Sequence, residues 1–196
     1  MSRLFTLSAL CCAIVATLPA AAQADDAQRF LEQKHNAVTR VMQRAPSSNR
    51  DAQLTRMLSE LLDYRELSRR SLGAHWEAQS DEQKDEFVSL LQRLVERSYR
   101  QNLQRTLSFQ VAYENAEARG EEALVQTEAR SRENRRAPPV SIDYLLRRDG
   151  RTWKVVDLTV DDGMSMVQSY RRQFDRIIER EGWDGLIRRM QQRLAS

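Results

Sequence analysis

The chain has few of the residues that form disulfides, metal sites and reactive centres. Its two cysteines, Cys11 and Cys12, lie in an N-terminal apolar run, and its two histidines, His35 and His75, are far apart. Once that run is removed, the remaining chain has no thiol nucleophile, no disulfide and no thiolate metal site. Neither histidine has a second ligand at helical spacing that looks directed toward the same point, which argues against zinc. We therefore expect neither a metal nor a cofactor.

Glycine is also scarce, and the main apolar run is short. The six glycines are scattered as breaks and turns, so there is no glycine-rich phosphate loop. The apolar run Leu4–Leu18 follows a basic start and is too short to remain as a membrane anchor. Ala22-Gln23-Ala24 fits the pattern of a signal peptidase site. The sequence predicts a signal peptide over residues 1–24, cleaved after Ala24, and one mature domain over residues 25–196.

Charge is abundant, but neither sign dominates. The chain has 31 basic and 28 acidic residues, and its formal net charge is +3. Arginines alternate with acids, as in Glu121–Glu133, and this mixture is typical of a solvated face with salt bridges. Nucleic-acid binding would need a continuous basic stripe instead. We expect no nucleic-acid partner.

The first half of the chain has helical periodicity. Ser80 with Gln83 forms a capping box, and the helix that follows has a broad apolar stripe that includes Phe87 and Leu91. Asp63 with Glu66 resembles a second cap, and Gly73 ends the helix that Asp63 opens. The helices predicted before Ser80 span Ala27–Arg44, Asp51–Leu62 and Tyr64–Leu72.

The apolar period then changes from about 3.6 to two, which predicts strands. Four alternating runs begin near Phe109, Ala123, Val140 and Thr152, and Asp149-Gly150 is a hairpin signal between the last two. A capped helix then begins at Ser165, Gly182 stops it, and a short terminal helix follows. The order predicts an α+β domain in which helices pack on one face of a curved four-stranded antiparallel sheet.

The polar residues in these strands leave two alternatives open. Asp143 and Asp157 lie on neighbouring predicted strands and could act as acid and base on a hydrophobic substrate, together with Tyr144. We favour the simpler interpretation, in which each is a carboxylate paired with arginine or placed at the end of a strand ladder. The chain could also be a ligand-free periplasmic adaptor with a filled core. We expect that it is not an enzyme and has no catalytic residues.

A set of motifs between Asp63 and Leu194 resembles the MlaC family of periplasmic phospholipid-binding proteins, the toluene-tolerance family. The motifs that carry the resemblance are Leu72-Gly73 with Trp76, Gln83 with Phe87, Tyr99, Pro138-Pro139-Val140, Ile142-Asp143-Tyr144, Trp153, Asp157, Gly163-Met164-Ser165-Met166 and Gly182-Trp183-Asp184-Gly185-Leu186. The family often has valine where Met164 stands. Glu114–Ala137 is unusually charged, so no family residue is carried over there.

The resemblance implies a soluble periplasmic lipid carrier. Such proteins hold phospholipid acyl chains in an apolar pocket between sheet and helices. They exchange lipid with an outer-membrane lipoprotein complex and an inner-membrane ABC transporter with MCE domains, which maintains outer-membrane asymmetry. We expect a monomer. The lipid-binding side chains are predicted from two things together, namely the periodicity that turns them toward the interior and the family match. They are Leu62, Leu67, Leu72, Phe87, Leu91, Val111, Tyr144, Val155, Met164, Val167, Tyr170 and Phe174.

Overall fold

The computed structural model describes residues 20–196, apart from the side chains of residues 102–106. Both cysteines and most of the predicted signal peptide therefore lie outside the described residues. The elements in chain order are α1 (Ala20–Met42), α2 (Ser48–Leu61), α3 (Tyr64–Leu72), a 3-10 turn (Gly73–His75), α4 (Asp81–Leu107), β1 (Phe109–Arg119), β2 (Glu122–Ser131), β3 (Val140–Asp149), β4 (Thr152–Val160) and α5 (Met166–Ala195). Within this part of the chain, no helix is both long and apolar enough to cross a membrane.

The predicted helix caps are present. Ser80 Oγ accepts a hydrogen bond from the backbone N–H of Gln83, and the Gln83 side chain accepts one from the N–H of Ser80. Asp63 caps α3 through the N–H of Glu66. Each cap satisfies N–H groups that a helix start leaves without partners, which is worth about 1 kcal/mol. Gly182 has φ of 71°, so α5 is kinked there into the two helical segments that the sequence predicted.

The four strands form an antiparallel meander in the order β1-β2-β3-β4, as predicted. The β1–β2 and β3–β4 turns contain Gly120 and Gly150, both at positive φ. Two element bounds differ clearly from the prediction. Helix α1 begins at Ala20 instead of Ala27, and β1 continues to Arg119, whereas alternation predicted a strand only through Glu114. A bulge between Tyr113 and Asn115 shifts the register, so Ala116 faces the same side as Tyr113 and strict alternation is lost.

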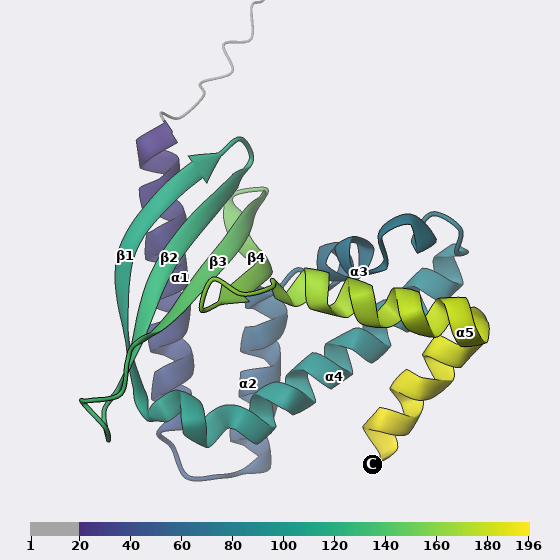
Figure 1. Cartoon of the computed structure of the whole chain (residues 1–196). Coiled ribbons are helices and arrows are strands. Elements are labelled where there is room, and N and C mark those ends of the chain that lie inside the picture. The colour runs from purple at the N-terminus through teal and green to yellow at the C-terminus, as the bar shows by residue number, and fades with distance from the viewer. Residues whose placement is uncertain (1–19) are drawn as a thin grey trace, which may run out of the picture.

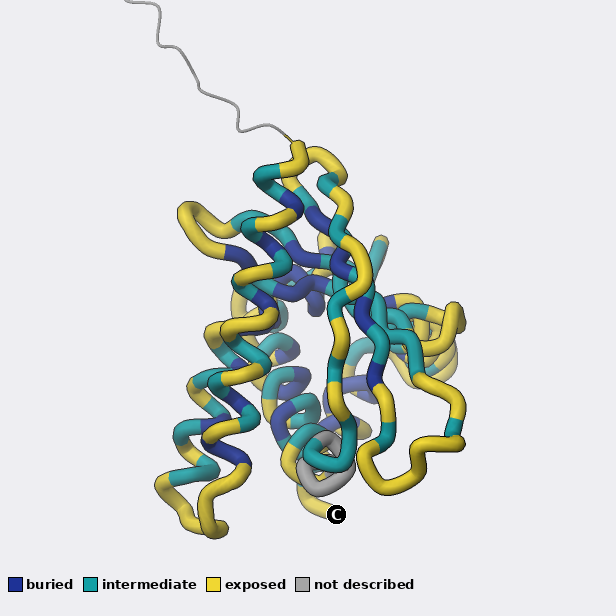
Figure 2. The backbone as a smooth tube through the Cα atoms, turned by 90° about the vertical axis from the view of Figure 1, so that its left-hand side faces the viewer, coloured by how far each residue is buried: buried dark blue, intermediate teal, exposed yellow. Residues whose placement is uncertain are grey.

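Helix α1 covers the inner face of the sheet, along β1 and β2 (Figure 1). Near the β1–β2 turn the two layers are closely packed, since Ala27 and Leu31 of α1 join a core cluster with Ala123 and Val125 of β2. The same cluster continues through α3, α4 and α5. The strands and α1 lie farther apart toward the β2–β3 connection (Figure 2). The core therefore fills one end of the sheet.

A second, smaller apolar cluster joins the helices at the other end. It consists of Val38, Val41 and Met42 of α1 with Leu54 of α2, and Tyr99 and Leu107 of α4 pack against it. This cluster fixes the position of the C-terminal half of α1 without using the sheet. The space between that half of α1 and the sheet forms the candidate site.

Candidate functional site

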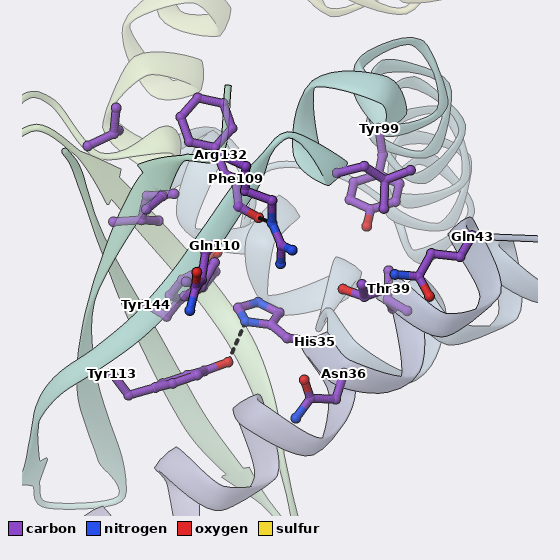
Figure 3. Close-up of a pocket in the computed structure, with 16 residues that line it drawn as sticks. His35, Asn36, Thr39, Gln43, Tyr99, Phe109, Gln110, Tyr113, Arg132 and Tyr144 are labelled. Carbon is purple, nitrogen blue, oxygen red and sulfur yellow. Dashed lines mark hydrogen bonds between the residues drawn. The ribbon is translucent and has the colours of Figure 1, made fainter. Parts of the chain in front are cut away.

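A cavity of about 520 Å³ lies between the C-terminal half of α1, the end of α4 and the inner faces of β1, β2 and β3 (Figure 3). Its size falls within the range of about 300–1,000 Å³ that is usual for small-molecule sites. The side chains around it are His35, Asn36, Val38, Thr39, Gln43, Tyr99, Leu107, Phe109, Gln110, Val111, Tyr113, Ala129, Arg132, Val140, Ile142 and Tyr144.

The sheet side of the cavity is apolar because of strand register. Val111 of β1, Ala129 of β2 and Val140 of β3 are paired across the three strands, and all three side chains point inward. The next inward row contains Tyr113, Thr127 and Ile142. Ala129 is the smallest of these residues and lies at the centre of its row, so the inner surface of the sheet is recessed there.

The helix side of the cavity is more polar. His35, Thr39 and Gln43 follow one another at four-residue spacing and therefore lie on one face of α1. The same face carries Leu31 one turn earlier, where α1 packs into the core. The row thus changes from apolar to polar where packing against the sheet ends. A polar face of this kind does not drive α1 to collapse onto the strands.

A polar contact within the cavity lining joins α1 to β1. His35 Nδ1 and Tyr113 Oη form a hydrogen bond of 2.6 Å, and the Tyr144 ring meets the His35 ring edge-on with centroids 5.2 Å apart. Burial lowers the pKa of His35 to about 4 and raises the pKa of Tyr144 to about 12. These groups are therefore neutral near pH 7, so this part of the cavity can hold an apolar chain.

Two of the twelve predicted lipid-binding residues, Val111 and Tyr144, line this cavity. The structure does not bring the other ten to it. Tyr170 packs at the edge of the core, and Met164 is 43% exposed in the β4–α5 connection. The remaining eight are buried within the core cluster, namely Leu62, Leu67, Leu72, Phe87, Leu91, Val155, Val167 and Phe174.

Sequence reasoning missed the contribution of α1. The sequence predicted His35 to be a solvated or locally bonded residue, whereas its hydrogen-bond partner, Tyr113, lies on β1 and is 78 positions away in the chain. The available signal was the row Leu31, His35, Thr39, where an apolar helix face becomes polar. Such a change marks the point at which a helix stops packing against its neighbour.

The two strand carboxylates do not converge on the cavity. Asp143 and Asp157 alternate with the inward residues and lie on the opposite face of the sheet from Tyr144. Asp157 Oδ1 accepts hydrogen bonds from the N–H groups of Leu158 and Val167 at 2.8 and 3.0 Å, which joins β4 to the start of α5. Among residues 20–196, no group of three or more His, Cys, Asp or Glu is placed to hold a metal.

Fold and cavity together define an α+β protein in which an open antiparallel sheet and its helices surround a largely apolar binding space. Comparison with known proteins identifies the family. The model of the MlaC protein family matches residues 32–192, and the chain belongs to this family.

Individual relatives are more distant. The intermembrane phospholipid transport system binding protein MlaC of Haemophilus influenzae is 25% identical over 123 residues, which is 62% of this chain and 57% of that protein. A phospholipid-binding protein from Ralstonia solanacearum, solved in complex with a phospholipid, has a similar fold with a TM-score of 0.74 at 23% identity. That match covers 87% of this chain and 97% of the other.

Proposed function

We propose that the protein is a periplasmic carrier that holds phospholipid acyl chains in the cavity between α1 and the sheet. The observation that carries the proposal is the cavity itself, since it is lined by valine, isoleucine and aromatic side chains and has neutral polar groups at its depth. Membership of the MlaC family and the phospholipid named for two relatives agree with it.

The physical reason for such a carrier is the cost of exposing acyl chains. Each methylene group kept from water is worth about 0.8 kcal/mol, so a lipid with two long chains crosses an aqueous gap very slowly without help. A cavity that covers the chains removes this barrier. Release then requires a partner that offers another apolar site. An inner-membrane MCE-domain ABC transporter and an outer-membrane lipoprotein complex would be those partners.

The proposal assigns Val111 and Tyr144 to the acyl-chain site, together with Ala129, Val140 and Ile142. It gives the buried residues of the core cluster a structural role and no contact with lipid. It requires no catalytic residue, and Asp143 and Asp157 have no role in lipid binding because they lie on the other face of the sheet.

Native mass spectrometry of residues 25–196, purified from a periplasm, tests the proposal directly. Organic extraction of the same sample identifies any bound molecule. We expect close to one diacyl phospholipid per chain. A bare polypeptide mass, with no lipid in the extract, would contradict the carrier function and favour a ligand-free adaptor.

A further inference from the structure

A second cavity of about 540 Å³ lies next to the first, at the start of the β2–β3 connection. Its lining is polar and basic and includes Arg130, Arg132 and Arg135, whereas the first cavity is lined mainly by apolar and aromatic residues. Gln110 and Arg132 line both cavities. A polar, positively charged space therefore adjoins the largely apolar one.

Arg132 connects the two spaces. Its Nε donates a hydrogen bond of 3.2 Å to the carbonyl of Phe109, and this contact holds the stem of the side chain against β1. The guanidinium projects into the opening between the sheet and α1, on the side of His35 (Figure 3). A group held there can meet the polar end of a molecule whose apolar part lies deeper.

Two of these arginines have no acidic partner within the described residues. Arg130 is paired with Glu128, but neither Arg132 nor Arg135 forms an ion pair with residues of the described range. Glu133 belongs to the same loop and lines neither cavity. Two guanidinium groups are thus available to an anion beside the opening of the first cavity.

We propose that Arg132 and Arg135 bind the phosphate of the lipid whose acyl chains occupy the first cavity. This inference rests on the proposed function and deepens it. In a phospholipid the phosphate lies next to the glycerol that carries the chains, so its binding group must adjoin the apolar space, as Arg132 does. Guanidinium groups bind phosphate oxygens through paired, charge-assisted hydrogen bonds.

The position of the site sets its specificity. The phosphate is common to all glycerophospholipids, while the group beyond it would lie in the solvent-exposed loop region. The site therefore accepts both anionic and zwitterionic phospholipids and selects against diacylglycerol, which has the same chains and no phosphate.

A competition experiment tests the assignment. Delipidated mature protein is mixed with vesicles that contain dioleoyl phosphatidylglycerol, dioleoyl phosphatidylethanolamine and dioleoylglycerol, then separated and analysed for bound lipid by mass spectrometry. The variant is the double substitution Arg132→Gln with Arg135→Gln. The control, Arg119→Gln with Arg151→Gln, removes two positive charges from the other end of the sheet, where Arg119 pairs with Glu117 and Arg151 is exposed.

We expect the variant to lower the loading of both phospholipids relative to dioleoylglycerol by about tenfold, equivalent to about 1.4 kcal/mol. The control should match the wild type. Because all proteins extract from the same vesicles, differences in how readily each lipid leaves the bilayer cancel. An unchanged ratio in the variant would overturn the assignment. A wild type that loads none of the lipids would overturn the proposed function and this inference with it.

A soluble phosphate ester distinguishes lipid from free anion. Glycerol 3-phosphate in large excess should leave the bound phospholipid in place, because it cannot use the apolar cavity. If glycerol 3-phosphate displaces the lipid or binds the delipidated protein as tightly as the lipid does, the arginines serve a free phosphate site and the headgroup assignment is wrong.

Discussion

Filling the cavity should abolish lipid binding while the fold remains, and Val111→Trp is the sharpest such change. Val111 lies on the inner face of β1, opposite Ala129, and lines the cavity. An indole at this position would extend into the space that we assign to the acyl chains. Tryptophan is well tolerated in strands, so the backbone of β1 should accept it.

The size of the effect follows from the methylene groups that the indole displaces. If the indole excludes about five methylene groups, the loss is about 4 kcal/mol, or close to a thousandfold in affinity. The delipidated variant should unfold at the same temperature as the delipidated wild type or a higher one, since the added ring buries apolar surface in an existing space.

The matched control is Ala112→Trp. Ala112 is the next residue on β1, is exposed and points to the opposite face of the sheet. Both variants are loaded from the same vesicles, and bound lipid is measured by native mass spectrometry with circular dichroism as the check on folding. Lipid retained by the folded Val111→Trp protein at the level of the Ala112→Trp protein would refute the placement of the acyl chains in this cavity.

Four further changes separate the fold from the site. Phe87→Ala empties a fully buried core position and should cost about 3–5 kcal/mol, seen as a lower midpoint in urea unfolding, with lipid lost only as the protein unfolds. Met164→Glu should leave bound lipid nearly unchanged because Met164 is exposed, and complete loss of lipid would place the chains at the β4–α5 connection instead. Hydrogen bonds from Arg69 and Arg70 lower the pKa of Glu66 to about 2, although burial acts in the opposite direction. The stability that this carboxylate adds is therefore complete above about pH 4.5 and is lost as the pH falls toward 2. The thermal unfolding temperature of Glu66→Gln should depend less on pH in that range. Burial lowers the pKa of His35 to about 4, so the free energy of unfolding should decrease as the pH falls from 6.5 to 4, while the imidazole stays neutral in the folded protein until the pH nears 4. Lipid affinity should therefore be constant above about pH 5 and fall as the pH nears 4, and His35→Phe should not show this fall.

The sequence predicted the fold well because each element has a local signal. The capping box at Ser80, the serine cap at Ser165, the Asp149-Gly150 hairpin and the change of period near Phe109 all act within a few residues, and all are confirmed. The extra length of β1 was missed for the same reason. A bulge interrupts the alternation after Tyr113, and the alternation was the only strand signal available there.

The candidate cavity was predicted less well, because a periodicity that turns a side chain inward does not distinguish a core residue from a cavity residue. Phe87 and Val111 both lie on apolar inner faces, yet Phe87 packs against Phe174 at 5.4 Å between ring centroids whereas Val111 faces open space. What decides between them is the opposing element. Opposite Phe87 lies an aromatic helix face, and near Val111 lies the polar row of α1, so the distinction depends on tertiary contacts that no single segment contains.

That polar row also explains how the cavity can persist without a ligand. A dry void of about 520 Å³ would cost roughly 12 kcal/mol at about 24 cal/mol per Å³, which is comparable to the whole stability of a typical domain. His35, Thr39 and Gln43 offer hydrogen-bonding groups along one wall, so water can fill the space when no lipid is bound. The sheet wall has none of these groups on Val111, Val140 or Ile142, so an acyl chain can displace that water there at a gain. A wall of each kind suits the proposed carrier function, because a carrier must remain folded both before it loads lipid and after it releases it.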